Sequence, residues 1–239
     1  MQGWRDKNLP SAEPCFSLNK RRGLVKIMGV MMNILAIGAH PDDLEYGCGG
    51  TLLKYSKKGV KIHLLVLTQG EIGGKPGVRK IEQGESAKIL KAKVYWGGYA
   101  DTEIPNDKGL ISKIENVIKL VKPDLIFVNY FNDTHQDHRS TAASTISATR
   151  HLRNVLFYEV PTTVDFTPTV FMDIGDVLQY KMKLLKAHKS QVYATKIAGR
   201  VGILSILESV RSCANFRGFQ GRVKYAEGFA PLRLSLNIK

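Results

Sequence analysis

Cysteine, acidic residues and long apolar runs are all scarce in this sequence. Its 239 residues include only three cysteines, with no Cys-x-x-Cys pair and one left over in any pairing. This usage indicates free thiols in a reducing compartment. No apolar run approaches the roughly 20 residues of a membrane-spanning helix, and residues 1–30 lack the apolar core and cleavage site of a signal peptide. We therefore expect a cytoplasmic protein with no transmembrane segment.

The shortage of acidic residues leaves a strongly basic chain. Lys and Arg number 35 against 21 Asp and Glu, which gives a formal charge of +14. Such a charge attracts anions: nucleic acid, an anionic lipid surface or a phosphorylated substrate. A solvated basic surface without a specific partner is an equally good interpretation. Since the chain carries no RNP, KH, zinc-finger or helix-turn-helix signature, we expect no nucleic-acid partner.

Residues 1–30 have scattered charge, two prolines and no periodicity. We predict that they form a poorly ordered N-terminal extension, and the alternative is a basic arm that touches an anionic partner. Residues 31–239 are predicted to form one domain, because this length suits a single sizeable core.

Beyond residue 30, apolar strand-like runs alternate with helix-like segments. Strands are predicted over 33–39, 60–68, 94–96, 124–130, 155–160 and part of 226–236, helices over 51–58, 78–92, 110–121, 141–150 and 173–188, and a glycine turn over 47–50. This alternation is typical of an α/β fold with a Rossmann-like, mostly parallel sheet and helices on both faces.

Two short motifs combine imidazole and carboxylate groups, Ala39-His40-Pro41-Asp42-Asp43 and His135-Gln136-Asp137-His138. Each follows an apolar run that is predicted to be a buried strand. In parallel sheets, ligands bind beyond the carboxyl ends of the strands. The two motifs therefore predict one metal site assembled from distant parts of the chain.

A catalytic zinc site needs three nitrogen or oxygen ligands and an open position for water. We predict that the ligands are His40, Asp43 and His138. Asp42 would then be the general base for the water that the metal activates, and His135 would donate to the developing oxyanion, with Asp137 orienting it. Iron or cobalt would also suit these ligands. For each motif alone, a hydrogen-bonding histidine at a strand end is the competing interpretation.

These residues resemble the PIG-L/LmbE-like zinc N-deacetylases. The supporting segments are Gly49-Gly50, Thr68-Gln69-Gly70-Glu71, Arg79-x-x-Glu82, Pro123-Asp124 and His188-x-Ser190-Gln191. The resemblance runs from about Asn33 to the end, and Gln136 stands where many members have proline.

The resemblance implies removal of the N-acetyl group from an N-acetylglucosamine-containing conjugate. It implies zinc on the three predicted ligands, Asp42 as base and His135 as the oxyanion donor. Arg79, Asp101 and Glu71 would contact the substrate, Arg79 near the acetyl oxygen or sugar and Asp101 at a sugar hydroxyl. Trimers or hexamers are frequent in the family, so a homo-oligomer is expected.

Two other functions stay open. One is an amidase of the same family that acts on a larger amide. The other is a Rossmann-like nucleotide-binding protein, although the first loop lacks Gly-x-Gly-x-x-Gly and its carboxylates would repel a pyrophosphate. The positive charge would suit an anionic or lipid-linked sugar conjugate.

Overall fold

The computed structural model describes residues 32–75, 77–192, 196–197, 200–201 and 205–235. The extension predicted for residues 1–30 lies outside this set, as does Cys15. The other two cysteines, Cys48 and Cys213, are free thiols, as predicted. All the described elements belong to one compact unit, Met31–Lys239.

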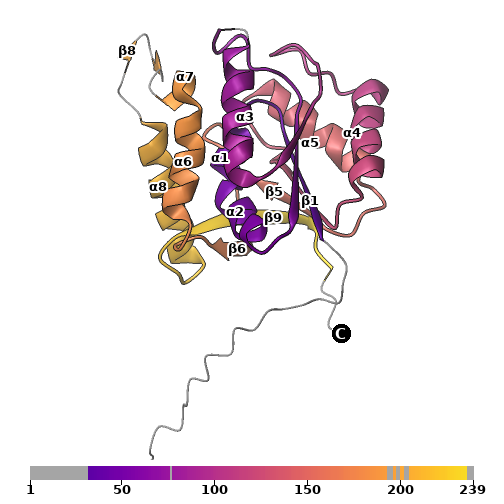
Figure 1. The fold of residues 1–239 in the computed structure, drawn as a ribbon. Helices are drawn as coiled ribbons and strands as arrows, with labels where there is room; N and C mark the ends of the chain where they lie inside the picture. The colour runs from indigo at the N-terminus through magenta and orange to yellow at the C-terminus, as the bar shows by residue number, and fades with distance from the viewer. Residues whose placement is uncertain (1–31, 76, 193–195, 198–199, 202–204, 236–239) are drawn as a thin grey trace, which may run out of the picture. The chain divides into compact units, whose positions relative to one another are not determined.

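Helices and strands alternate along most of this unit (Figure 1). The strands are β1 (Asn33–Gly38), β2 (Lys61–Val66), β3 (Lys93–Trp96), β4 (Leu125–Asn129), β5 (Val155–Tyr158), β6 (Val170–Asp173), β7 (Lys196–Ile197), β8 (Arg200–Val201) and β9 (Ala226–Arg233). The helices are α1 (Asp43–Gly47), α2 (Gly49–Lys57), α3 (Val78–Leu90), α4 (Lys108–Val121), α5 (Gln136–Ala148), α6 (Leu178–Ala187), α7 (Lys189–Val192) and α8 (Ile206–Gln220).

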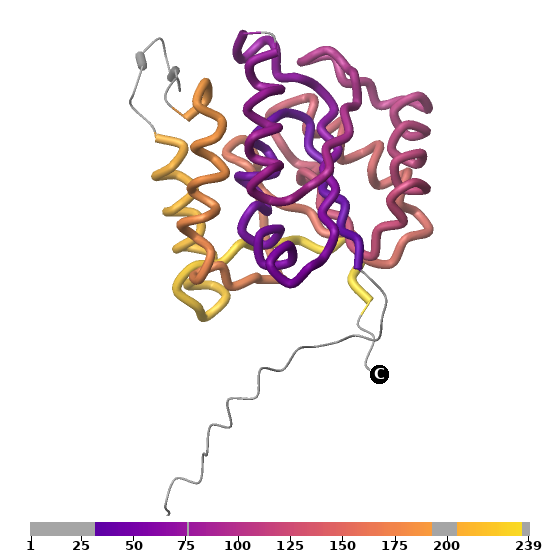
Figure 2. The backbone as a smooth tube through the Cα atoms, in the orientation of Figure 1, coloured from indigo at the N-terminus to yellow at the C-terminus, as the bar shows by residue number. Residues whose placement is uncertain are grey.

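Seven of these strands form one mixed sheet in the order β3-β2-β1-β4-β5-β9-β6. The first five are parallel, and β9 runs antiparallel to both β5 and β6. In Figure 2 the yellow strand β9 leaves the lower end of α8 and runs back across the molecule to complete the sheet. The predicted α/β fold, with a mostly parallel sheet covered on both faces, is confirmed.

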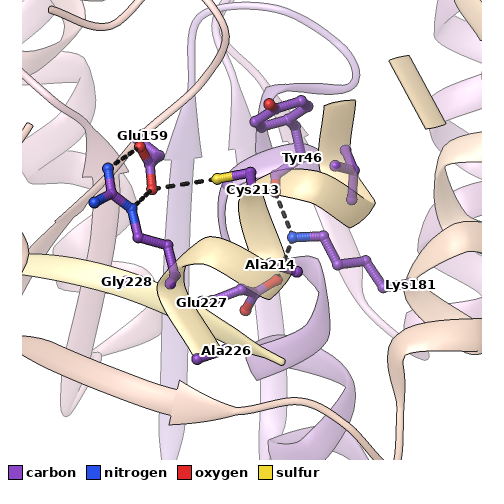
Figure 3. Close-up of a pocket in the computed structure, with 11 residues that line it drawn as sticks. Tyr46, Glu159, Lys181, Cys213, Ala214, Ala226, Glu227 and Gly228 are labelled. Atoms are coloured by element: carbon purple, nitrogen blue, oxygen red, sulfur yellow. Dashed lines mark hydrogen bonds and ion pairs between the residues drawn. The ribbon is translucent and has the colours of Figure 1, made fainter. Parts of the chain in front are cut away.

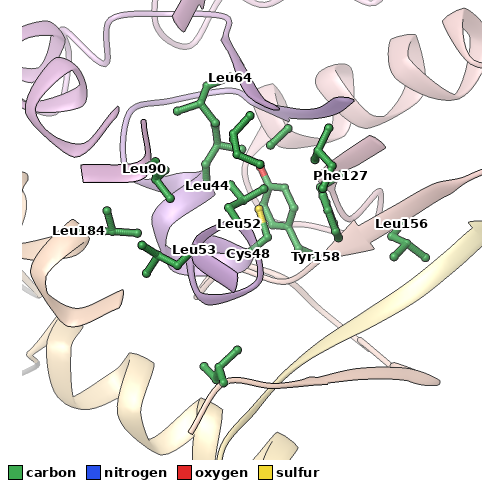
Figure 4. Close-up of a cluster of buried hydrophobic side chains, with 14 of the residues drawn as sticks. Leu44, Cys48, Leu52, Leu53, Leu64, Leu90, Phe127, Leu156, Tyr158 and Leu184 are labelled. Carbon is green, nitrogen blue, oxygen red and sulfur yellow. The ribbon is translucent and has the colours of Figure 1, made fainter. Parts of the chain in front are cut away.

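Alternate residues of the central strands supply two separate cores. On β1, Ile34 and Ala36 pack with α1, α2, α3 and α6, whereas Leu35 and Ile37 pack with α4 and α5. Because successive side chains of a strand point to opposite faces, a strand covered on both faces must be apolar throughout. Figure 4 shows the first cluster, in which Tyr158 lies among the leucines of the surrounding helices.

The glycine turn predicted over 47–50 is wrong for its three glycines, which belong to two consecutive helices separated by Cys48 alone. Gly47 ends α1, and Gly49 and Gly50 open α2. Close packing explains their presence: a Cβ atom at Gly47 would overlap the ring of Tyr158, and one at Gly50 would crowd Ile174. These glycines allow close contact between neighbouring elements.

Replacing Gly47 with alanine is expected to destabilise the protein by about 1–3 kcal/mol, because the added methyl group overpacks against the Tyr158 ring. Urea denaturation would measure the change. Gly84→Ala is the matched control: Gly84 lies within α3, and its Cβ would meet nothing within 4 Å. That variant should gain about 0.5–1 kcal/mol from helix propensity. A Gly47→Ala protein as stable as the wild type would contradict the packing argument.

Three other element predictions need correction. The helix predicted over 141–150 begins earlier, at Gln136, and the helix predicted over 173–188 is preceded by β6 and begins at Leu178. Helix α8 was not predicted, although Ser205 caps it by accepting a hydrogen bond from the Glu208 backbone N–H at 3.3 Å. The Ser-x-x-Glu spacing is the signal that would have indicated its start.

Across the described residues, no helix is both long enough and apolar enough to cross a membrane.

Candidate active site

The two histidine motifs meet at the carboxyl edge of the sheet. The first follows β1 and the second follows the loop after β4, and β1 and β4 are neighbouring parallel strands. Strand order reverses here, since β2 and β3 extend to one side of β1 and β4 and β5 to the other. Such a switch point opens a crevice at the strand ends, where ligands bind in open α/β sheets.

The turn from β1 into α1 presents two carboxylates differently. Asp42 precedes α1 with φ 87°, in the left-handed region that aspartate tolerates better than most residues. Its carboxylate makes no capping bond to the helix, so it stays available to the crevice. Asp43, the first residue of α1, is buried, and its Oδ2 accepts from the backbone N–H of His40 at 3.0 Å.

The start of α5 presents the second motif. His135 is the N-cap residue, and its Nδ1 accepts from the backbone N–H of Asp137 at 3.2 Å. Asp137 and His138 follow in the first turn, and both are buried. The early start of α5 therefore places the motif on a rigid helix end instead of on a loop.

The predicted ligand set (His40, Asp43 and His138) converges on one point. His40 Nδ1 lies 3.2 Å from His138 Nε2. Asp43 Oδ1 lies 3.4 Å from His138 Nε2, and Asp43 Oδ2 lies 3.7 Å from His40 Nδ1. Ligands about 2.0–2.1 Å from a tetrahedral ion are separated by about 3.3–3.4 Å. The two ring nitrogens and the Asp43 carboxylate thus lie close to the spacing that such an ion requires, with a different Asp43 oxygen nearest to each ring.

The other nitrogen of each ligand histidine contacts carboxylates. His40 Nε2 lies 2.9 Å from Asp101 Oδ1 and 3.0 Å from Asp137 Oδ2. His138 Nδ1 lies 3.1 Å from Asp133 Oδ2. If each of these nitrogens donates its proton to a carboxylate, two imidazole lone pairs face each other across 3.2 Å. A cation between them would relieve this repulsion, and carboxylate support of this kind is usual for metal-bound histidines.

Neighbouring carboxylates favour the protonated form of both histidines. Burial by itself lowers the pKa of His40, but its hydrogen bonds to Asp101 and Asp137 outweigh burial and raise that pKa to about 9. Burial likewise lowers the pKa of His138, yet Asp43 and Asp133 raise it to about 10. The pocket is therefore built to hold positive charge.

A second group of donor atoms shares His40. His40, Asp101 and Asp137 form an alternative set of possible metal ligands, the alternative carboxylate group, whose ligand atoms lie within 4.8 Å of one another. Backbone N–H groups already occupy these carboxylates: Asp101 Oδ2 accepts from Ile72 at 3.0 Å, and Asp137 accepts from Thr102 at 2.8 Å. Their role fits orientation of His40 better than metal ligation. His40, His135 and His138 also have ring nitrogens within 4.8 Å of one another, but the His135 Nδ1 is occupied.

Asp42 is held by Arg79. The Arg79 guanidinium lies 3.3 Å from Asp42 Oδ1 and also donates to the carbonyls of Pro41 and Gly70 at 2.7 and 3.0 Å. Burial raises the pKa of Asp42 to about 6, although the positive charge of Arg79 opposes this. A carboxylate with a pKa near neutrality is suited to general base chemistry.

His135 has a defined tautomer. Because its Nδ1 accepts a backbone N–H, the proton resides on Nε2. Burial and the neighbouring His40 and His138 lower the pKa of His135, which favours the neutral ring. His135 is one of the residues that line the crevice, so its Nε2–H is a hydrogen-bond donor on the crevice wall.

The crevice is a cavity of about 350 Å³, which we call the substrate cavity. It is lined by His40, Asp42, Asp43, Ile72, Gly73, Arg79, Asp101, Thr102, His135, His138, Val160, Pro161, Thr162 and Gln191. Its volume lies in the range of small-molecule sites. Among these lining residues, Arg79 is the only arginine or lysine, so the +14 charge is not concentrated on the cavity wall.

Three predicted roles differ from the contacts observed. The Asp137 carboxylate contacts His40 and not His135, because its backbone, and not its side chain, meets the His135 ring. Asp101 lines the cavity, but its Oδ1 contacts His40 Nε2 and its Oδ2 accepts a hydrogen bond from the Ile72 backbone N–H. Glu71 lies behind it and accepts from the Asp101 backbone N–H at 2.8 Å.

Two of the supporting sequence segments, Arg79-x-x-Glu82 and His188-x-Ser190-Gln191, contact each other. Glu82 of α3 accepts from the backbone N–H and the hydroxyl of Ser190 at 2.8 and 2.6 Å. Nearby, Glu45 of α1 accepts from Ser86 at 2.6 Å and from Gln83 at 2.7 Å. These bonds fix α1, and with it the turn that carries Asp42, against α3, and they fix α3 against α7.

Sequence reasoning missed Asp133 and Asn129. Asp133 supports His138, and Asn129, at the end of β4, donates to Asp43 Oδ2 at 3.4 Å. The signal for Asp133 was its position two residues before His135, on the loop that carries the motif. Asn129 had a weaker signal, as a polar residue that ends a fully buried strand.

Another enclosed space lies between α1, α6, α8 and β9 (Figure 3). Lys181 there donates to Glu227 at 2.6 Å, and Glu227 also accepts the Gly50 and Thr51 backbone N–H groups, each at 2.7 Å. The enclosed space has a volume of about 10 Å³, which is enough for no more than about one water molecule. This buried network fixes the start of α2 and is not a substrate site.

Asp133→Asn is expected to weaken divalent-metal affinity by about 10–100-fold, because the amide no longer holds the His138 ring as a carboxylate does. Competition with a chromogenic chelator would measure the dissociation constant. The matched control is Asp124→Asn, just before the other end of β4, which should leave metal affinity unchanged. Equal affinities in the two variants would contradict the supporting role of Asp133.

Comparison with known proteins identifies the family of the chain. The profile of the PIG-L family, described as GlcNAc-PI de-N-acetylase, matches residues 35–149. The chain is 36% identical over 197 residues to an Escherichia coli K12 protein named Uncharacterized deacetylase YaiS, and the match covers 77% of this chain and 100% of that protein.

Two solved structures share the fold. N,N'-diacetylchitobiose deacetylase from Pyrococcus horikoshii, complexed with its inhibitor MPG, is similar with a TM-score of 0.71 and 26% identity, covering 87% of this chain and 86% of that chain. The hydratase GalB from Pseudomonas putida KT2440 has a TM-score of 0.73 and 21% identity, covering 87% of this chain and 100% of that chain. The fold alone therefore does not decide between amide hydrolysis and hydration.

Proposed function

The chain belongs to the PIG-L family of de-N-acetylases, and from this premise we propose that it removes the N-acetyl group from an N-acetylglucosamine-containing conjugate with the help of a divalent metal. The observation that carries the proposal is the convergence of the ligand set, with donor atoms 3.2, 3.4 and 3.7 Å apart, beside Asp42 and His135.

The donor set fits a metal ion. His40 Nδ1, the Asp43 carboxylate and His138 Nε2 would hold it, and the carboxylates on the opposite ring nitrogens would orient the two histidines. A divalent metal bound there would polarise the amide carbonyl and lower the pKa of water at its open position. Zinc is the expected ion, and two nitrogens with a carboxylate also suit iron or cobalt.

The other residues supply proton transfer and charge stabilisation. Asp42 takes a proton from the water whose oxygen attacks the amide carbon, and Arg79 holds the Asp42 carboxylate in place. His135 Nε2–H donates to the carbonyl oxygen as negative charge develops on it. Asp42 then gives the proton to the leaving nitrogen as the carbon–nitrogen bond breaks, which releases acetate and a free amine.

The substrate cavity supports a sugar on the amine side of that bond. Its wall includes polar side chains from two loops, Thr102 and Thr162, and from helix α7, Gln191. An anionic or lipid-linked conjugate stays part of the proposal on the strength of the net charge of +14. Nucleotide binding is disfavoured, because carboxylates stand where a pyrophosphate would lie.

Metal analysis combined with an acetate-release screen tests the proposal. The screen would compare neutral, phosphorylated and lipid-linked N-acetylglucosamine conjugates. We expect one equivalent of divalent metal per chain, equal amounts of acetate and free amine, and loss of both with a chelator until metal is restored. Absence of acetate release from every conjugate by the metal-loaded protein would contradict the proposal, and so would undiminished turnover without metal.

A further inference from the structure

A second, smaller space shares lining residues with the substrate cavity, among them the catalytic carboxylates. We call it the acyl chamber; it is lined by Asp42, Asp43, Tyr46, Val160, Pro161, Leu185 and Ile206. Four of these residues, Asp42, Asp43, Val160 and Pro161, also line the substrate cavity. The base and one metal ligand therefore stand between the two spaces.

The walls of the two spaces differ in chemistry. Apart from the two carboxylates, the acyl chamber is enclosed by apolar surfaces from α1, α6, α8 and the loop after β5. The hydroxyl of Tyr46 is bonded to Ser209 Oγ at 2.8 Å, so the ring supplies an apolar surface. Leu185 is buried with 1% of its surface exposed. Among the described lining residues, only the two carboxylates have side-chain groups suited to binding a sugar hydroxyl.

An amide substrate has two sides that match this division. Its amine side, the sugar, needs polar partners and a wide opening, which the substrate cavity offers. Its acyl side is apolar and must lie across the reacting carbon from the amine. With the carbon beside Asp42, the acyl group faces the acyl chamber.

The volume of the chamber exceeds the need of an acetyl group. It measures about 90 Å³, whereas about 10–15 Å³ on this scale accommodates one water molecule. A methyl group is only slightly larger than water, so acetyl alone would leave most of the chamber without contacts. Unfilled apolar space forfeits dispersion and hydrophobic energy that a longer chain would gain.

We propose that the acyl chamber binds the acyl group of the substrate and that this chain hydrolyses propionyl and butyryl amides of glucosamine conjugates better than acetyl amides. The inference rests on the proposed function and deepens it by naming the acyl class. Ile206 and Leu185 would be the residues that set chain length, because they form the apolar wall contributed by α8 and α6.

The test is a series of N-acylglucosamine conjugates from acetyl to octanoyl, given to the metal-loaded protein. We expect kcat/KM to rise about fourfold with each methylene up to butyryl, as for burial of one methylene group, and to fall by octanoyl. Ile206→Trp should abolish the rise. Leu207→Trp, at the next position of α8 and outside the chamber lining, should retain it.

A binding measurement keeps the inference separate from turnover. Titration calorimetry with acetate, propionate and butyrate should show the same fourfold steps in affinity for the wild-type protein and none for Ile206→Trp. Rising affinities without hydrolysis of any amide would support the chamber as the acyl-binding site, and would overturn the proposed function together with the hydrolytic preference that rests on it. Flat or falling affinities and rates from acetyl to butyryl would overturn the inference, while acetyl hydrolysis would leave the proposed function intact.

Discussion

Asp42→Asn is expected to lower kcat by about 10²–10⁴-fold while metal content stays at the wild-type level, because the amide cannot take a proton from water. The side chain lies on the cavity wall beside the ligand set but makes no capping bond to α1. Asparagine also tolerates the left-handed backbone at this position, so the fold should be retained. Steady-state kinetics and metal analysis on the same preparation would measure both quantities.

Asp43→Asn is the matched comparison for this variant. The neighbouring carboxylate belongs to the ligand set, so its replacement should reduce metal content as well as activity. If Asp42→Asn also lost its metal, Asp42 would be a ligand. If it kept both metal and full activity, the proton would be taken by another group.

His138→Ala is expected to reduce metal affinity by more than about 100-fold, which exceeds the usual effect of removing a supporting partner of a ligand. The imidazole supplies one of the three donor atoms, and removing it also leaves Asp133 without its partner. Chelator competition would measure the affinity, and circular dichroism would check that the fold is retained.

His135→Ala distinguishes the proposed ligand role of His138 from the proposed oxyanion-donor role of His135. The two rings stack with centroids 4.8 Å apart, but His138 Nε2 lies 3.2 Å from His40 Nδ1, whereas the Nδ1 of His135 accepts a backbone N–H. His135→Ala should keep the metal and lose about 10²–10³-fold in kcat, as expected for loss of one oxyanion donor. Loss of metal in both variants would place His135 among the ligands.

Much of the fold and the core of the site were predictable from local patterns. Continuous apolar runs indicated doubly covered strands, and polar residues directly after two of them indicated a site at the sheet edge. The adjacency of β1 and β4 did not follow from periodicity. It depends on sheet order, which is set by long-range packing of helices on both faces.

The errors have local physical causes. The glycines at 47–50 were interpreted as a turn because glycine weakens helices, but here the cost is offset by close contact with Tyr158 and Ile174. Helix α5 begins at an unusual cap, His135, so its first turn carried no familiar start signal.

Carboxylate partners were the hardest part of the site to predict. The sequence contains 21 acidic residues, and spacing alone does not tell which of them reach a histidine. Asp101 and Asp137 converge on His40 from the loop after β3 and from the first turn of α5. That meeting is a property of the folded chain. It gives the Asp137 carboxylate a different partner from the predicted His135, while the sugar contact of Asp101 stays a prediction.

Anomalous X-ray diffraction from crystals of the metal-loaded protein, at the absorption edge of the bound metal, tests the central claim most directly. The account predicts one strong peak per chain, about 2.0–2.2 Å from each donor atom of the ligand set. A peak within the alternative carboxylate group, or no peak at the edge of the sheet where β1 and β4 end, would contradict it.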